Sequence, residues 1–121
     1  MRLRNRVAFL GVGLFIAAIV YRAYDAHGGD ALTGQQKYVA NCQSCHGVKG
    51  LGDGEQASDL ANIPRDLEKE INRLLAYDSI VIPRLVLDGN TAKGMPAFRG
   101  QLSEQDVKDI FAYIRQVNKS Y

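Results

Sequence analysis

Residues 42–46 read Cys-Gln-Ser-Cys-His, and this stretch decides what kind of domain the chain forms. The pattern Cys-x-x-Cys-His is the attachment signature of a c-type haem. Two thiols separated by two residues can each add to one vinyl group on the same haem edge. The adjacent imidazole then lies beneath the iron as an axial ligand. The stretch therefore predicts one covalently bound haem c, attached to Cys42 and Cys45 and ligated by His46.

Two other kinds of site use similar residues. A Cys-x-x-Cys pair can be a thioredoxin-type redox centre, but the strand–helix–strand context of that centre is missing from this sequence. A zinc ion could in principle bind Cys42, Cys45, His46 and His27. Adjacent residues are poor tetrahedral partners, however, and His27 lies outside the expected domain. Two cysteines are also too few for a disulfide framework or a four-cysteine zinc site.

The second axial ligand is expected in residues 93–98, which read Lys-Gly-Met-Pro-Ala-Phe. Met95 is the only methionine besides Met1. A lone methionine usually fills a core, but a loop bounded by glycine and proline suits a fixed ligand better than a flexible filler. Met95 follows His46 by 49 residues, so the intervening chain can wrap around the haem. We predict Met95 as the sixth ligand, with His27 as the alternative.

The rest of the domain reads as helices joined by long loops. We predict four helices: one from a capping box of Thr33 and Gln36 to about Cys42, and others over 65–77, over 79–87, and from the cap residue Ser103 onward. Segments 47–58 and 92–100 are rich in glycine and are predicted as loops. The apolar face of the last helix consists of Val107, Ile110, Phe111, Ile114 and Val117. The domain is therefore all-α, and a haem is expected to fill its modest core.

The N-terminus predicts export across a membrane. Residues 1–6 are positively charged, and residues 7–21 form an unbroken apolar run. As a helix this run measures about 22 Å, short of a hydrocarbon core of about 30 Å, although flanking arginines can reach both interfaces. We predict a signal-anchor helix over 1–22, a polar linker over 23–31 and the haem c domain over 32–121. The domain would be periplasmic, either anchored or, if the leader is cleaved, soluble.

The distribution of charge argues against nucleic-acid binding. The chain has 15 lysines and arginines, 13 acidic residues and a net charge of +2. Four of the arginines stand in the first 22 residues, which contain no acidic residue, so the remaining 99 residues carry a net charge of −2. A slightly acidic domain does not provide the basic patch that nucleic acids require.

These residues resemble the small class I monohaem c-type cytochromes of bacteria. The resemblance spans roughly residues 32–121. It rests on Gly34, Tyr38, the Cys-x-x-Cys-His-Gly motif followed by Gly50 and Gly52, the Gly-Met-Pro-x-Phe segment, and Tyr113-Ile114 in the closing helix.

The resemblance implies a fold of three to five helices around a covalently bound haem. The first and last helices would cross through Gly34, Tyr38, Phe111 and Tyr113-Ile114. Leu60 would pack on the porphyrin. In many members a proline in the stretch matching 57–60 supplies the carbonyl that accepts a hydrogen bond from the proximal histidine. Ser58 stands there in this chain.

An iron ligated by both His46 and Met95 has no open site for a small-molecule substrate. The sequence therefore predicts an electron carrier, not an enzyme, with a haem buried among Leu60, Ile80, Val86 and Phe98. It would be a membrane-tethered carrier between respiratory or dehydrogenase partners; the alternative is a fixed haem subunit of a larger membrane oxidoreductase. Next to the two ligand loops stand Lys49, Lys93 and Arg99, which are predicted to form either a basic rim that steers acidic redox partners or ordinary solvated surface charges.

Overall fold

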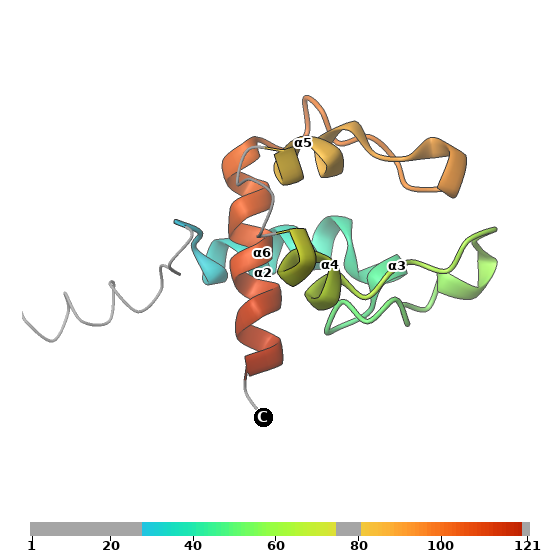
Figure 1. Cartoon of the computed structure of the whole chain (residues 1–121), viewed down its shortest axis with the longest axis horizontal. Coiled ribbons are helices and arrows are strands. Elements are labelled where there is room, and N and C mark those ends of the chain that lie inside the picture. Colours follow the sequence, from blue (N-terminus) through green and yellow to red (C-terminus); the bar gives the residue numbers. More distant parts are fainter. Residues whose placement is uncertain (1–27, 75–80, 120–121) are drawn as a thin grey trace, which may run out of the picture.

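The computed structural model describes residues 28–74 and 81–119. They form the helices α2 (Ala31–Asn41), α3 (Gln43–His46), α4 (Leu67–Leu74), α5 (Val81–Asp88) and α6 (Glu104–Lys119), and the 3-10 helices η1 (Ala57–Asp59) and η2 (Thr91–Lys93). Figure 1 shows α2 passing behind α6, with η1 and η2 at the tips of loops that extend away from this crossing. Within the described residues, β pairing is limited to isolated bridges, which confirms the predicted all-α architecture.

The crossing of α2 and α6 is the centre of the fold. A Cβ atom at Gly34 would overlap the backbone carbonyl of Asp109 in α6, so the two helices approach closely because Gly34 has no side chain. One turn later Tyr38 is fully buried and packs against Tyr113, with ring centroids 5.5 Å apart. The crossing that the family resemblance implies is therefore confirmed at these residues.

The hydrophobic core lies along one face of α6. Four of the five predicted apolar residues of this helix are buried, and Val117 is half-buried. The helices α2, α4 and α5 contact α6 and contribute side chains to this core. The core consists of Tyr38, Ile71, Ile82, Leu87, Phe98, Leu102, Val107, Ile110, Phe111 and Ile114.

The predicted start of the first helix was wrong by three residues. Asp30 is the N-cap of α2, and its carboxylate accepts a hydrogen bond from the backbone N–H of Leu32 at 3.0 Å. The Thr33 hydroxyl also donates to Asp30, at 2.8 Å, instead of capping a helix of its own. An aspartate at the N-cap is as good a cap as threonine, and this cap places the buried residue Ala31 within α2.

The other helices begin close to where the sequence predicts. Ser103 and Asp106 exchange hydrogen bonds at the start of α6: the Ser103 hydroxyl accepts from the N–H of Asp106 at 3.1 Å, and the Asp106 carboxylate accepts from the N–H of Ser103 at 2.8 Å. This confirms the predicted cap. The predicted helices over 65–77 and 79–87 are observed as α4 and α5, while their residues 75–77 and 79–80 lie outside the described residues.

The residues just before α2 pack against α6. Gly29 is buried, and a Cβ atom there would overlap the carbonyl of Lys108. The N–H of Asp30 donates to the carboxylate of Asp109 at 2.8 Å. The apolar segment 7–21 and linker residues 23–27 lie outside the described residues. Among helices within 28–74 and 81–119, none combines the length and apolarity needed to cross a membrane.

Candidate haem-binding site

The Cys-x-x-Cys-His stretch forms a tight helical turn directly after α2. Cys42 ends α2 and begins α3: its N–H donates to the carbonyl of Tyr38 at 2.8 Å, and its own carbonyl accepts from the N–H of His46 at 2.8 Å. Residues three apart in a helical turn lie on the same face. Cys42 and Cys45 therefore share one side of the turn, where both are half-buried free thiols. Burial, reinforced by Cys45, raises the pKa of Cys42 to about 12.

His46 is held neutral inside the domain. Burial lowers the pKa of His46 below its usual value, and the backbone of Arg65 opposes this lowering only in part. Its Nδ1 atom is buried and makes no hydrogen bond, which is unusual for a buried polar atom. A neutral imidazole offers a lone pair to a metal, so the state of His46 fits a role as an iron ligand.

The backbone that approaches His46 belongs to Arg65, not to residues 57–60. Arg65 is the backbone group that raises the pKa of His46. Two neighbouring contacts hold this segment in place: the N–H of Leu67 donates to the carbonyl of Gly50 at 2.7 Å, and a Cβ atom at Gly52 would overlap the carbonyl of Pro64. Sequence reasoning missed Arg65 because a backbone group leaves no signature in the side chains.

The loop after His46 folds back onto α3. The N–H groups of Gly52, Gly54 and Gln56 donate to the carbonyls of His46, Cys45 and Ser44 at 2.9, 3.2 and 2.9 Å, respectively. Gly47 has φ +82°, and a Cβ atom there would overlap the Asp53 carboxylate. Glycine is therefore needed at position 47 for the turn itself, in addition to the room that the sequence suggests it leaves beside a haem.

Tyr38 links this loop to the helix crossing. Its hydroxyl donates to the carbonyl of Gly47 at 2.6 Å, and both groups are buried. Burial raises the pKa of Tyr38 above its usual value, so the hydroxyl keeps the proton that it donates. The residue after His46 is thus fixed to the most buried side chain of α2.

We expect Tyr38→Phe to lower the free energy of unfolding by about 1–3 kcal/mol, because the buried Gly47 carbonyl loses its donor. Denaturant unfolding of the haem-loaded protein measures this change. Tyr113→Phe is the matched control, since it alters the other ring of the pair and leaves the Gly47 bond intact. Equal stability of wild type and Tyr38→Phe would show that the bond does not hold the loop.

Met95 is presented by a closed loop on the other side of the domain. Asn90 and Met95 exchange backbone hydrogen bonds of 2.9 and 3.0 Å, with η2 between them. The N–H of Phe98 donates to the carbonyl of Leu87 at 2.8 Å and fixes the loop to α5. Met95 is half-buried and packs against the hydrophobic core. Its sulfur is therefore carried by a constrained backbone, as a fixed ligand requires.

The two halves of the expected site meet at Leu60. A Cβ atom at Gly94, next to Met95, would lie 3.5 Å from a methyl carbon of Leu60. Leu60 ends η1, and η1 contacts α3, which carries the two thiols. The Met95 loop and the Cys42–His46 turn thus approach one common region. Of the predicted haem contacts, Phe98 is buried, Leu60 and Val86 are half-buried, and Ile80 lies outside the described residues.

The alternative ligand sets gain no support. His27 lies outside the described residues, both as a zinc ligand and as a sixth ligand of iron. Across residues 28–74 and 81–119, no group of three or more His, Cys, Asp or Glu side chains could hold a metal ion. Two thiols, a neutral imidazole and a thioether sulfur are instead the groups that a covalently bound haem uses. The residues present therefore fit haem c.

Comparison with known proteins also indicates a haem c protein. Residues 29–114 match the family described as cytochrome C oxidase, cbb3-type, subunit III. The chain is 34% identical over 109 residues to cytochrome c6 of Nostoc sp., covering 89% of this chain and 86% of that protein. It is 36% identical over 86 residues to cytochrome c6 of Anabaena variabilis, covering 70% of this chain and 88% of that protein.

A third relative is much longer. Quinohemoprotein alcohol dehydrogenase of Comamonas testosteroni is 36% identical over 83 residues, which are 68% of this chain and 10% of that protein. The fold and site define a class I monohaem c-type cytochrome. The chain belongs to this cytochrome c family, carries covalently bound haem c, and transfers electrons to and from redox partners.

The three predicted rim cations lie in different settings. Arg99 forms an ion pair with Asp88 and lowers the pKa of that carboxyl group. Lys93 is exposed in η2. Lys49 lies near the C-terminal end of α6, because its carbonyl accepts a hydrogen bond from Asn118 at 3.0 Å. Asp88, the partner of Arg99, belongs to α5, and α5 is bonded to the other end of α6 through Arg84 and Glu104. A length of α6 of about 21 Å therefore separates these two contacts.

Proposed function

We propose that this cytochrome transfers electrons through a haem attached to Cys42 and Cys45, with His46 and Met95 as axial ligands. The observation that carries this proposal is His46: a half-buried, neutral imidazole whose Nδ1 atom is buried and unbonded, on the same turn as two free thiols. The constrained Met95 loop, which reaches Leu60, supports the second ligand.

Bound in this way, haem c supplies a reversible one-electron Fe(III)/Fe(II) couple whose potential a thioether ligand raises. The chain's own residues hold the two ligands in place. Tyr38 fixes the backbone beside His46, the Asn90 hydrogen bonds fix the backbone of Met95, and Phe98 covers the interior beside the Met95 loop. With both axial positions filled, no position is left for a substrate, so we propose a non-catalytic electron carrier.

The location proposed for the protein follows from its N-terminus. Residues 1–22 would act as a signal-anchor, 23–31 as the connection, and 32–121 as the haem domain on the periplasmic side. Because Gly29 and Asp30 already pack on α6, the connection between anchor and packed domain is as short as residues 23–27. A cleaved leader and a soluble periplasmic domain remain the alternative.

A second candidate is a fixed haem subunit of a larger complex. The name of the matching family is that of an oxidase subunit. The chain is also 28% identical over 92 residues, 74% of its length, to the cytochrome c subunit of a quinone-type alcohol dehydrogenase from Gluconobacter oxydans. A short connection to a membrane anchor suits permanent assembly as well as lateral diffusion.

Purification from membranes in mild detergent, followed by intact-mass measurement, tests these proposals together. We expect one covalently attached haem, retention of residues 1–22 and no stoichiometric partner. A mass lacking the leader would reject the anchor, and a stoichiometric partner would favour the subunit function. Cys42→Ala and Cys45→Ala variants, each leaving one thioether, are the controls for the attachment sites.

A further inference from the structure

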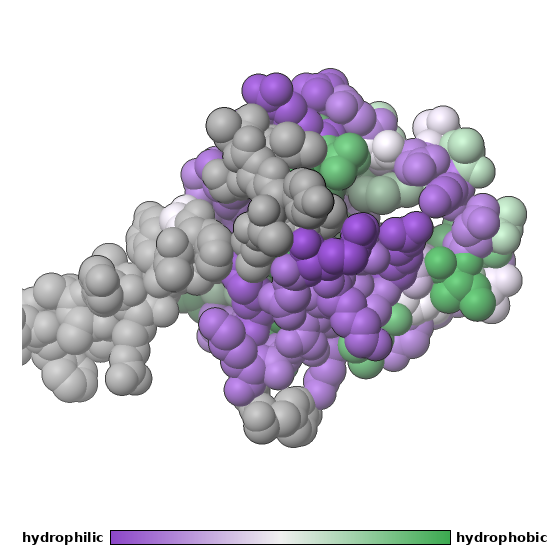
Figure 2. Space-filling view, in the orientation of Figure 1, coloured by the Kyte–Doolittle hydropathy of each residue, from purple (hydrophilic) through white to green (hydrophobic). Residues whose placement is uncertain are grey.

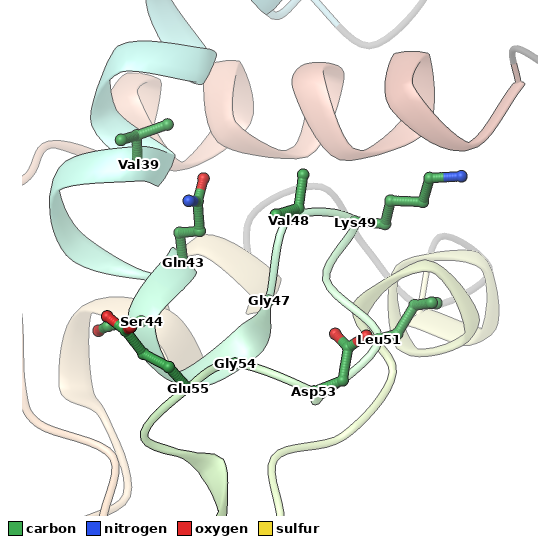
Figure 3. A pocket seen from close by; sticks show the side chains of 10 residues that line it. All are labelled: Val39, Gln43, Ser44, Gly47, Val48, Lys49, Leu51, Asp53, Gly54 and Glu55. Carbon is green, nitrogen blue, oxygen red and sulfur yellow. The ribbon is translucent and has the colours of Figure 1, made fainter.

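An open groove lies beside the haem-attachment turn, on a surface that none of the four proposed haem-binding residues lines. In Figure 3, one side of the groove is formed by α3 and the end of α2, and the other side by the loop that follows His46. Its lining residues are Val39, Gln43, Ser44, Gly47, Val48, Lys49, Leu51, Asp53, Gly54 and Glu55. It is therefore a surface feature distinct from the interior region where Met95 and Leu60 approach.

Exposed apolar side chains are concentrated in this groove. Val39, Val48 and Leu51 are 51%, 62% and 46% exposed and all line it. The other large apolar side chains that are exposed in the described residues, Leu32, Ile63 and Leu85, lie outside it. The face in Figure 2 is mostly hydrophilic, and its apolar atoms lie in small groups, some of them near the tips of the loops. Clustered apolar residues with polar neighbours are typical of a protein-binding surface.

The groove is joined directly to the haem-attachment turn. Gln43 and Ser44, which line it, are the two residues between the cysteines. The segment that carries Asp53 and Glu55, the two acidic lining residues, is bonded to the same turn. The N–H of Gly54 donates to the carbonyl of Cys45, and the N–H of Gln56 donates to that of Ser44. A protein seated in the groove would therefore contact the backbone that carries the haem thioethers.

The charges of the groove select the kind of partner. Its lining includes two carboxylates, Asp53 and Glu55, and one cation, Lys49. We propose that the groove docks a redox partner protein that presents an apolar contact patch ringed by basic side chains. This inference rests on the electron-transfer function and differs from the acidic partners that the predicted basic rim would attract. Electron-transfer encounters need only a small interface, which a groove of this kind can provide.

The test measures the rate of electron exchange between the full haem-loaded protein and a strongly basic soluble c-type cytochrome, at low and at physiological ionic strength. We expect Glu55→Gln to slow the reaction roughly threefold at low salt and to weaken its salt dependence, because one attractive charge is lost. Val48→Ser should slow it by a similar factor at both salt concentrations, since it removes apolar contact. Both side chains are exposed, so folding should not change.

Matched controls are available in the same chain. Leu85→Ser removes an apolar side chain of comparable exposure, and Glu68→Gln removes a carboxylate in α4; neither residue lines the groove. Wild-type rates for these two variants, together with slowed groove variants, support the proposal. Unchanged rates for Val48→Ser and Glu55→Gln would overturn it, as would faster exchange with an acidic cytochrome. Self-association that Val48→Ser abolishes would overturn the assigned partner in favour of a second copy.

The same experiment separates this proposal from the proposed haem ligation. All variants should be fully reduced by a small chemical reductant and should keep the midpoint potential of the wild type. Normal potentials with unaltered exchange rates would reject the groove and leave the electron-transfer function intact. A protein without a reversible haem couple would instead reject the proposed function itself.

Discussion

Met95→Ala should lower the midpoint potential by on the order of 100 mV, because the thioether that favours ferrous iron is removed. The oxidised iron should also lose part of its low-spin signal, since one strong axial ligand is missing. A redox titration and an electron paramagnetic resonance spectrum measure the two changes. The expectation follows from the closed Asn90–Met95 loop, which holds this one side chain at the core.

A second substitution shows that the effect belongs to ligation and not to packing. Met95→Leu fills a similar volume without offering a sulfur. If packing alone mattered, Met95→Leu would behave as wild type, whereas loss of a ligand predicts the same fall in potential for both variants. A Met95→Ala protein that kept its potential and its low-spin spectrum would remove Met95 from the site.

Gly34→Ala should destabilise the haem-loaded protein by about 3 kcal/mol, the upper end of the usual cost of overpacking. The added Cβ atom would overlap the Asp109 carbonyl, which is backbone and can yield only if α2 and α6 separate. Because Tyr38 lies on the same face of α2, separation would also weaken its bond to Gly47. Thermal or denaturant unfolding measures the loss.

Gln35→Ala is the matched control, because residue 35 is exposed in the same helical turn. Alanine favours helix formation over glycine by about 1 kcal/mol, so the helix itself would gain from Gly34→Ala. A Gly34→Ala variant as stable as wild type would mean that the helices do not cross at this point.

Residues whose roles depend on local pattern were predictable from the sequence. The Cys-x-x-Cys-His turn, the Ser103 cap and the apolar face of α6 all follow from spacing along one element. The start of α2 did not, because Asp30 and Thr33 are both good caps and the choice between them depends on packing against α6. Local propensity could not distinguish two caps three residues apart.

Features that join distant segments were harder to predict from the sequence. Arg65 acts on His46 through its backbone, and backbone groups are the same in every residue. The ion pair of Arg99 and Asp88 joins residues 11 apart across a turn, so the sequence could place a charge near the Met95 loop but not show that it is neutralised. The groove likewise forms only where α2 meets the loop after His46.

The central claim is that His46 and Met95 both ligate the iron of one covalent haem. The chain contains only two methionines, Met1 and Met95, so a spectrum of the methionine methyl groups is simple to assign. Nuclear magnetic resonance of the reduced protein, labelled at these methyl groups, is the most direct measurement. We expect one methyl resonance shifted far upfield by the porphyrin ring and absent from Met95→Leu. Two resonances at ordinary methionine positions would contradict the account.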